Sequence, residues 1–416
     1  SNGTAVLGLG DIGPAASKPV MEGKALLFKI FADIDVFDIE INEKDPDKFI
    51  EVVKAISTTF GGINLEDIKA PEAFKIEKEL VDQLDIPVMH DDQHGTAIIS
   101  AAALLNALEL VDKNIKDVKI VVSGAGAAAI ACTKLYLSFG AQLKNILMTD
   151  SKGVINKSRE GLSKEKKFFV SNRDINTLEQ AMVDSDVFVG LSMANILSEK
   201  MLKTMARDPI VFAMANPDPE ISYDKAMSAR EDIIFATGRS DLPNQVNNVL
   251  GFPFIFRGAL DVRATKINEE MKKAAVVALA ELAKKPVPEQ VNIAYDETKL
   301  NFGKDYIIPK PFDPRLISEI PPAVAKAAID SGVAQEPITD WDKYTEILDE
   351  RLGNNQKLIR IIHRSARKVK EKKLVFTEAD HLDVLKAAQI CFEEKIAEPI
   401  LLGRKKIIEE LMESLD

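Results

Sequence analysis

Short apolar runs with many β-branched residues alternate with helical stretches between about residues 91 and 320, and no other feature of the sequence constrains the fold as strongly. A helix that joins two consecutive strands of one sheet makes those strands parallel, because the chain returns to the starting edge before the next strand begins. We therefore predict an α/β fold with a doubly wound parallel sheet. The predicted strands are residues 118–122, 146–149, 187–191, 210–213 and 233–236.

Two glycine-rich sequences are candidates for binding a dinucleotide. The first, GLGDIG at residues 8–13, follows a predicted strand at 5–9, but Pro19 and Gly23 interrupt any helix that would direct its N-terminus at a pyrophosphate. The second, GAGAAA at residues 124–129, opens a run of small helix-forming residues, which permits close packing of helix on strand. We assign the cofactor to the second motif, in a Rossmann-like NAD(P) domain, and interpret the first as a turn. The predicted cofactor contacts are Gly124, Gly126 and Ala129.

The residues after the second predicted strand bear on the choice of cofactor. Asp150 follows strand 146–149, near the position where Rossmann-like domains recognise ribose hydroxyls. Its carboxylate favours NAD, because a negative charge repels the 2′-phosphate of NADP. Ser151 and Lys152 come next and could instead hold that phosphate. We expect NADP or NAD as the cofactor, and Lys152 leads us to favour NADP.

Two pairs of adjacent acids, Glu66-Asp67 and Asp91-Asp92, each follow a short apolar run. Acids at the carboxyl ends of strands face the crevice where α/β proteins bind ligands. Their oxygens suit Mg²⁺ or Mn²⁺, although either pair alone is more often a solvated loop. His90 and His94 flank the second pair, but their spacing lacks the H-E-x-x-H pattern of zinc enzymes. We interpret both histidines as packing residues or as neighbours of the metal ligands.

Composition narrows the classes of partner. Asp and Glu number 65 against 54 Lys and Arg, a net charge of −11, so we expect neither nucleic acid nor an anionic membrane as a partner. Residues 97–110 form the longest apolar stretch, which is too short to span a bilayer, and no signal peptide is visible at the start. Cys132 and Cys391 are too few for a disulfide framework, and we expect a cytoplasmic protein.

The order of the predicted elements indicates three domains. Residues 1–93 indicate a smaller α/β domain for substrate and metal, incomplete as it stands, with a strand predicted at 34–41. The NAD(P) domain covers residues 94–334, and residues 335–357 are predicted to be a linker. Residues 358–416 predict a basic helix and a partial βαβα unit. Two strands rarely form a stable sheet alone, so we expect this last part to be a truncated domain.

Nine stretches of the chain resemble, in order, bacterial malic enzymes of the type that is fused to a phosphotransacetylase-like domain. Residues 373–416 resemble the opening of that second domain, most clearly in EPILLG at 398–403. The resemblance implies oxidative decarboxylation of malate to pyruvate and CO2, with reduction of NADP or NAD and dependence on Mg²⁺ or Mn²⁺. The nine stretches are residues 8–13, 23–24, 64–67, 90–96, 123–129, 213–217, 238–241, 244–248 and 308–315.

The resemblance also implies roles for single residues. Lys24 corresponds to the general base on the C2 hydroxyl of malate, which requires a pKa well below the ordinary lysine value of ~10.4. Asp91 corresponds to the residue that orients Lys24. The implied metal ligands are Glu66, Asp67 and Asp92. The residues implied in substrate or cofactor binding are Asn216, Asn247 and Asn248, together with Lys24.

One departure from the family keeps alternatives open. The family's acid is a tyrosine that precedes the first glycine turn, whereas the first of the five tyrosines here is Tyr136, so we expect that an N-terminal portion is missing. A catalytically incomplete, nucleotide-binding regulatory chain is therefore one alternative. A metal-independent NAD(P) amino-acid or hydroxy-acid dehydrogenase is another. The fused domain further implies acetyl-CoA as an allosteric effector, and we expect a homo-oligomer.

Overall fold

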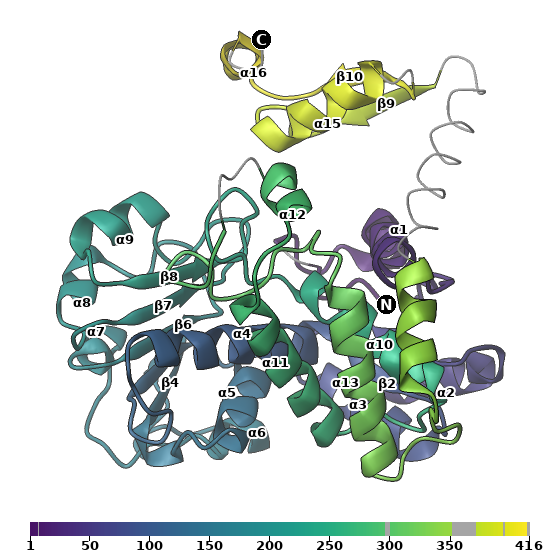
Figure 1. The fold of residues 1–416 in the computed structure, drawn as a ribbon. Helices are drawn as coiled ribbons and strands as arrows, with labels where there is room; N and C mark the ends of the chain where they lie inside the picture. The colour runs from purple at the N-terminus through teal and green to yellow at the C-terminus, as the bar shows by residue number, and fades with distance from the viewer. Residues whose placement is uncertain (7, 296–299, 352–371, 394–395, 414–416) are drawn as a thin grey trace. The chain divides into compact units, whose positions relative to one another are not determined.

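The computed structural model describes residues 1–6, 8–295, 300–351, 372–393 and 396–413 (Figure 1). The chain divides into two compact units, Ser1–Leu348 and Asp349–Asp416, and each is described by itself. The basic helix predicted at the start of residues 358–416 lies outside the described residues.

A six-stranded sheet lies on the left side of the first unit as drawn in Figure 1. Its strand order is β5-β4-β3-β6-β7-β8, and every neighbouring pair is parallel except β4 and β5. The chain winds outward from β3 in one direction and from β6 in the other, which confirms the predicted doubly wound α/β fold. The reversal between β3 and β6 is where such sheets bind ligands. The strands are β3 Ile120–Ser123, β4 Ile146–Asp150, β5 Gly153–Val154, β6 Val187–Gly190, β7 Ile210–Ala213 and β8 Ile234–Thr237.

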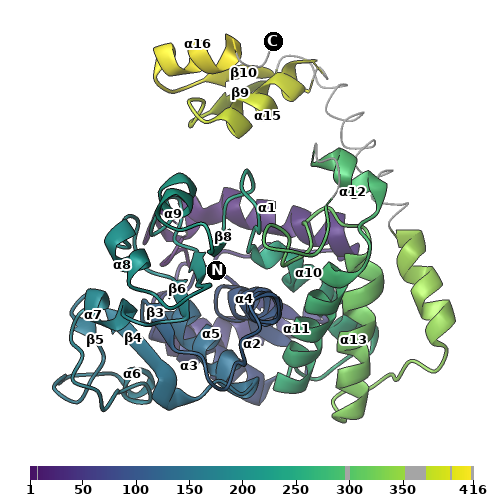
Figure 2. The ribbon, with the colours of Figure 1, turned by 60° about the vertical axis from the view of Figure 1, so that its left-hand side comes forward.

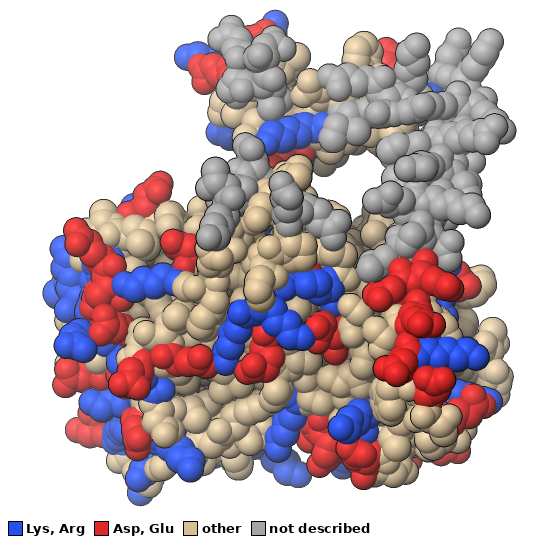
Figure 3. Space-filling model, in the orientation of Figure 1, with Lys and Arg blue, Asp and Glu red and all other residues tan. Residues whose placement is uncertain are grey.

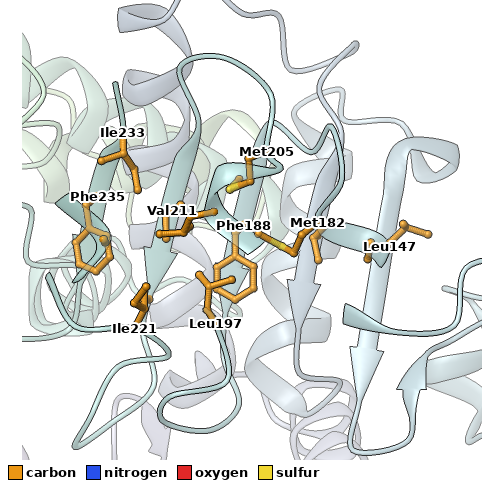
Figure 4. Packing of buried hydrophobic residues seen from close by; sticks show 14 of the residues in the cluster. Leu147, Met182, Phe188, Leu197, Met205, Val211, Ile221, Ile233 and Phe235 are labelled. Carbon is orange, nitrogen blue, oxygen red and sulfur yellow. The ribbon is translucent and has the colours of Figure 1, made fainter. Parts of the chain in front are cut away.

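An apolar cluster covers one face of this sheet (Figure 4). Phe188 of β6 and Val211 of β7 are fully buried in it, together with Met182 and Leu202 from two short helices. Because helices and loops cover both faces of a parallel sheet, its strands are nearly continuous apolar runs. This continuity is the reason that the apolar runs predicted the strands of this domain.

Helix α4 (Asp91–Leu110) is apolar on nearly every side, since it is enclosed by other helices. It packs against α5 and α11, and α11 packs against α13. Figure 2 shows α4 near the centre of these helices. The helices that follow α4 in this unit are α5 Ala127–Ser138, η2 Leu143–Asn145, α6 Lys164–Lys167, α7 Leu178–Met182, α8 Glu199–Lys203, α9 Tyr223–Ala229, η3 Asn248–Leu250, α10 Phe252–Asp261, α11 Glu269–Lys284, α12 Glu289–Ala294 and α13 Leu316–Asp330.

The N-terminal part of this unit is a smaller α/β layer with its own core, in which Phe49, Ile76 and Leu80 are buried. Its two strands pair in parallel, with Leu65 opposite His90. Its elements are α1 Gly13–Ala32, α2 Pro46–Ile56, η1 Ser57–Thr59, β1 Ile63–Leu65, α3 Glu72–Gln83 and β2 Val88–His90.

The two strands predicted for this part from apolar alternation are wrong. Among the described residues of 5–9, only a single bridge joins Val6 to Gly10, and residues 34–41 form no strand. Ser1 donates to the carbonyl of Ile39 and accepts from the N–H of Ile41, but these two bonds do not form part of a strand. An alternating pattern forms a strand only where a second strand lies beside it.

The expected interruption after the first glycine motif is also wrong, because α1 runs unbroken through Pro19 and Gly23. A proline inside a helix removes one hydrogen bond and crowds the preceding turn. Met21 and Phe28 are buried on the inner face of α1, so their packing offsets this local cost. The unbroken helix carries Lys24 into the interior.

The second unit contains two parallel strands and two helices, in the predicted order of strand, helix, strand and helix. Ala379, Leu385 and Ile408 form its small core. Leu374 and Val375 on its first strand are 45% and 48% exposed, so this sheet is only partly covered. The elements are β9 Lys373–Phe376, α15 Leu382–Glu393, β10 Glu398–Leu401 and α16 Lys405–Glu413.

Charged side chains are spread over the surface. On the face shown in Figure 3, Lys and Arg are intermingled with Asp and Glu. Among the described helices, not one combines the length and the apolarity that a membrane crossing requires. Part of the predicted linker is also helical, since residues 341–351 form helix and the hydroxyl of Tyr344 donates to Asp261 Oδ2 at 2.8 Å.

Candidate functional site

Glu66, Asp67 and Asp92 meet where β1 and β2 end. Because Leu65 pairs with His90 in a parallel register, the residues that follow these strands lie side by side. One carboxylate oxygen from each acid lies within 4.8 Å of the others. The backbone N–H of Asp67 donates to Asp92 Oδ2 at 2.8 Å, and Asp67 has a left-handed φ of 54°. The structure therefore brings together the three residues for which the sequence implied a metal.

The environment of these carboxylates fits a divalent cation. Burial raises the pKa of Glu66, and burial together with the charges of Asp92 and Glu66 raises the pKa of Asp67 to about 8. Asp67 Oδ2 is buried and has no hydrogen-bond partner in the described part of the chain. A nearby cation would stabilise these crowded carboxylates and the unpartnered oxygen. Three hard oxygen donors suit Mg²⁺ or Mn²⁺.

Lys24 of α1 lies beside this set. Its Nζ is 2.9 Å from Glu66 Oε1, contacts Asp91 Oδ2, and lies 3.9 Å from the centroid of the Phe252 ring. Burial lowers the pKa of Lys24, but the carboxylates of Asp91, Glu66 and Asp92 outweigh burial and hold this pKa above its ordinary value. Three acids surround one amine, so the lowered pKa that the resemblance implies for Lys24 depends on a divalent cation at the neighbouring carboxylates.

Asp91 joins Lys24 to the loop after β8. It is fully buried at the first position of α4, and Asn248 Nδ2 donates to the same oxygen, Oδ2, that Lys24 contacts. A side chain at Gly95 would overlap the Asp91 carboxyl, so glycine is needed one turn later. Asn247 instead accepts from the N–H of Val249 at 3.0 Å and caps η3. The structure thus brings Asn248 to Asp91 and places Asn247 beside it as a cap.

The second glycine motif lies at the carboxyl end of β3 and opens α5. Gly124 has a φ of 117° and packs against the carbonyl of Leu191, where a side chain would overlap. Gly126 precedes the helix and has open space where a side chain would stand, whereas Ala129 is buried in the first turn of α5. This arrangement leaves the N-terminal N–H groups of α5 accessible to a phosphate.

Asp150 at the end of β4 is held by two cations that sequence reasoning missed. Arg159 Nη2 and Lys166 Nζ each lie 3.0 Å from its carboxylate, and the N–H of Lys152 donates to Oδ1 at 2.9 Å. Burial raises the pKa of Asp150, but these hydrogen bonds outweigh burial and lower it. Ser151 and the side chain of Lys152 are exposed beside it. Only the basic composition of residues 157–167 hinted at such partners.

Asn216 lies at the carboxyl end of β7 and is exposed. A cis peptide bond joins it to Pro217, and its side chain lies next to Gly238. Its Nδ2 donates to the carbonyl of Met214 at 3.3 Å. A side chain at Gly8 of the first glycine motif would contact Pro217. The N-terminal turn therefore lies against the loop that contains Asn216. Asn216 therefore belongs to the same edge of the sheet as Gly124 but does not join the Lys24 cluster.

Glu77 of α3 is a further residue that sequence reasoning missed. Its Oε1 accepts from the N–H of His90 at 2.8 Å, and His94 Nε2 lies 2.9 Å from the same oxygen. One carboxylate therefore fixes both flanks of the Asp91-Asp92 pair. His94 contacts Glu77, whereas His90 is fully buried and its Nδ1 lies 3.8 Å from Asp92 Oδ2 of the acidic cluster.

Comparison with known proteins assigns the chain to a family. Residues 1–81 match the family described as malic enzyme, N-terminal domain, residues 93–297 match malic enzyme, NAD binding domain, and residues 357–416 match phosphate acetyl/butaryl transferase. The NADP-dependent malic enzyme of Salmonella typhimurium is 57% identical over the whole chain, which covers 55% of that relative. The chain therefore spans about half the length of this relative.

Two further proteins match most of the first unit. The NADP-dependent malic enzyme of Halomonas elongata is 58% identical over 81% of the chain and 80% of its own length. A crystal structure of malic enzyme from Pyrococcus horikoshii superposes with a TM-score of 0.79 at 38% identity, covering 88% of this chain and 83% of that one. The chain belongs to the malic enzyme family.

Proposed function

We propose that the protein oxidatively decarboxylates malate to pyruvate and CO2 with NADP as the hydride acceptor, in a reaction that depends on Mg²⁺ or Mn²⁺. One observation carries the proposal: a lysine whose side chain is only 12% exposed contacts Asp91 and Glu66, and Glu66 belongs to a set of three carboxylates with oxygens within 4.8 Å of one another. This arrangement supplies a proton-transfer group and a cation site in one place.

The residues of this cluster divide the chemistry among them. Glu66, Asp67 and Asp92 would hold the metal, which supplies positive charge that lowers the pKa of the malate hydroxyl and of Lys24 and stabilises negative charge on the substrate oxygen. Lys24 accepts the proton of the C2 hydroxyl. Asp91 holds the Lys24 amine in place, and Asn248 in turn holds Asp91. Asn216 and Asn247 lie on neighbouring loops where substrate or cofactor would be bound.

NADP is supported over NAD by the surroundings of Asp150. A free carboxylate at this position would repel a 2′-phosphate, but Arg159 and Lys166 neutralise it. Lys152 follows on the same turn and is exposed. Gly124, Gly126 and the start of α5 would bind the pyrophosphate, so the phosphate groups and the basic side chains lie along one edge of the sheet.

The proposal is tested by following reduction of NADP and of NAD with malate and Mn²⁺, with and without a chelator. Malate-dependent reduction that the chelator abolishes is the expected result. Reduction that survives the chelator would favour a metal-independent dehydrogenase. Binding of NADP without any turnover would favour a catalytically incomplete regulatory chain.

Similarity and composition support further proposals about the effector, the oligomeric state and the cellular location of the protein. Residues 357–416 match the family described as phosphate acetyl/butaryl transferase, and we propose acetyl-CoA as an effector of the whole protein. We also propose a cytoplasmic location, since Cys132 and Cys391 are both free thiols, and we keep the homo-oligomer as a further proposal.

A further inference from the structure

Glu220 is a fully buried carboxylate in the loop after β7, at the carboxyl ends of the central strands. Its Oε1 accepts from the N–H of Ser192 at 3.1 Å, and its Oε2 accepts from the N–H of Ala215 at 3.0 Å. No basic side chain pairs with it among the described residues. Burying a carboxylate without a cation is costly, so its position calls for an explanation.

The end of β6 is shaped to accommodate this side chain. A Cβ atom at Gly190 would overlap the carboxyl group of Glu220. The backbone around Glu220 is fastened as well, because its carbonyl accepts from the N–H of Leu197 at 3.0 Å and the carbonyl of Pro219 accepts from the N–H of Asn195 at 3.1 Å. Four hydrogen bonds, two of them to the carboxylate, therefore tie the loops after β6 and β7 to this segment.

The loops after β6 and β7, which these hydrogen bonds connect, form one edge of the cofactor crevice. Ala215 directly precedes Asn216. Ser192 Oγ lies 3.0 Å from Ser123 Oγ, and Ser123 directly precedes Gly124. Because Gly124 packs on the carbonyl of Leu191, the glycine turn lies on the loop that Glu220 holds.

We infer that Glu220 is a positioning residue of the cofactor site. Its carboxylate sets the spacing between the ends of β3, β6 and β7, and this spacing determines where the dinucleotide binds. The inference rests on the proposed function, because it takes NADP as the molecule that occupies this crevice. Dinucleotides bind at the carboxyl ends of such strands, where backbone N–H groups and glycines must approach closely. Glu220 holds these loops at the fixed separation that dinucleotide binding requires.

Glu220→Gln tests this role while keeping the shape of the side chain. A glutamine offers one acceptor, and its NH₂ group would face a backbone N–H, so one of the two bonds is lost and two donors are opposed. We expect the dissociation constant of NADP, measured by calorimetry on the full chain, to rise roughly 10-fold or more. The Mn²⁺ dissociation constant should stay within about twofold of the unchanged protein. Glu231→Gln, an exposed glutamate in the same domain, is the matched control.

Gly190→Ala provides a second, independent arm. It adds one methyl group that would displace Glu220, so it should weaken NADP binding alone but add little in the Glu220→Ala background, where the space is vacant. Equal effects of Gly190→Ala in both backgrounds, or an NADP affinity of Glu220→Gln within about twofold of the unchanged protein, would overturn the inference. Loss of Mn²⁺ binding in parallel would also overturn it, since general unfolding would then explain the result. If the unchanged protein bound no NADP, the proposed function would fail as well.

Discussion

Asp91 illustrates how single residues in this site depend on one another. Its carboxylate is fully buried, and Lys24 and Asn248 both reach the same oxygen. A buried carboxylate of this kind is tolerated because a cation and a hydrogen-bond donor satisfy it. Replacing Lys24 by an uncharged residue therefore leaves Asp91 without its cation and would also remove the proposed proton acceptor.

Lys24→Ala should lower turnover by at least ~10²-fold, because general acid–base groups contribute at least that much. It should also lower the free energy of unfolding by about 3–5 kcal/mol, since Asp91 and Glu66 lose their buried partner. Steady-state kinetics and urea unfolding measure the two effects. Lys18→Ala on the same helix, whose side chain is 40% exposed, is the control. Near-normal turnover in Lys24→Ala would show that another group accepts the proton.

Asp92→Ala should abolish Mn²⁺ binding and leave NADP binding unchanged within about twofold. The change removes one of three oxygen donors, and the remaining two acids come from a single loop after β1. Calorimetry with each ligand separates the two affinities. Asp85→Asn, at an exposed acid before β2, controls for a general loss of negative charge. Unchanged Mn²⁺ affinity in Asp92→Ala would contradict the proposed ligand set.

Arg159→Ala should raise the Michaelis constant for NADP about 10-fold and change that for NAD by less than about twofold. The reason is that Asp150 loses the neutralising charge held 3.0 Å away and then repels the 2′-phosphate. Lys152→Ala should act in the same direction, and Lys157→Ala, at an exposed lysine of the same loop, is the control. Equal changes for both cofactors would mean that these side chains do not recognise the phosphate.

Residues that were found from the sequence stand in a recognisable local pattern, and residues that were missed do not. The pattern placed the two acid pairs after short apolar runs, and the family resemblance selected Glu66, Asp67 and Asp92, which the structure brings together. Glu77 and Glu220 act through backbone N–H groups of other segments. No spacing in the sequence encodes such contacts, because they depend on how the loops fold over the ends of the strands.

Elements of the structure were predicted as far as burial dictates them. Five strands of the main sheet are continuous apolar runs, and their positions followed from that pattern, whereas the two-residue β5 was not predicted. The predicted strand at 34–41 failed because no described strand lies beside it. Helix α1 was missed because Pro19 is a helix breaker by local propensity, whereas the packing of Met21 and Phe28 determines the outcome.

Pro19→Ala should raise the free energy of unfolding by about 1–3 kcal/mol. Alanine restores the backbone hydrogen bond that proline lacks in the middle of α1, and the exposed position gives the new side chain room. Pro14→Ala is the matched control. In the first turn of a helix a backbone N–H has no helical acceptor, so proline costs no helical hydrogen bond there. Urea unfolding of both variants provides the measurement. A loss of stability in Pro19→Ala would show that α1 depends on the proline for its geometry.

At the scale of the whole molecule, the second unit raises a question of regulation. Two parallel strands with a partly exposed face form only part of a sheet, and these residues match a phosphate acetyl/butaryl transferase family. The Halomonas relative matches 81% of the chain. We therefore propose that an effector of the complete protein would act through the second unit.

Acetyl-CoA should inhibit malate oxidation in a protein that carries the complete transferase-like domain, and a chain ending at Leu348 should escape that inhibition while it retains turnover. The compact unit Ser1–Leu348 contains the Lys24 cluster and the glycine turn, so removal of the rest spares the chemistry. Coupling between two sites is typically about 1–3 kcal/mol, which limits the change in malate affinity to roughly 5- to 150-fold. Dose responses of both proteins to acetyl-CoA, with free CoA as the control ligand, provide the measurement. Equal inhibition of the shortened chain would place the effector site within the malic enzyme module, because no transferase residues would then be present to bind it.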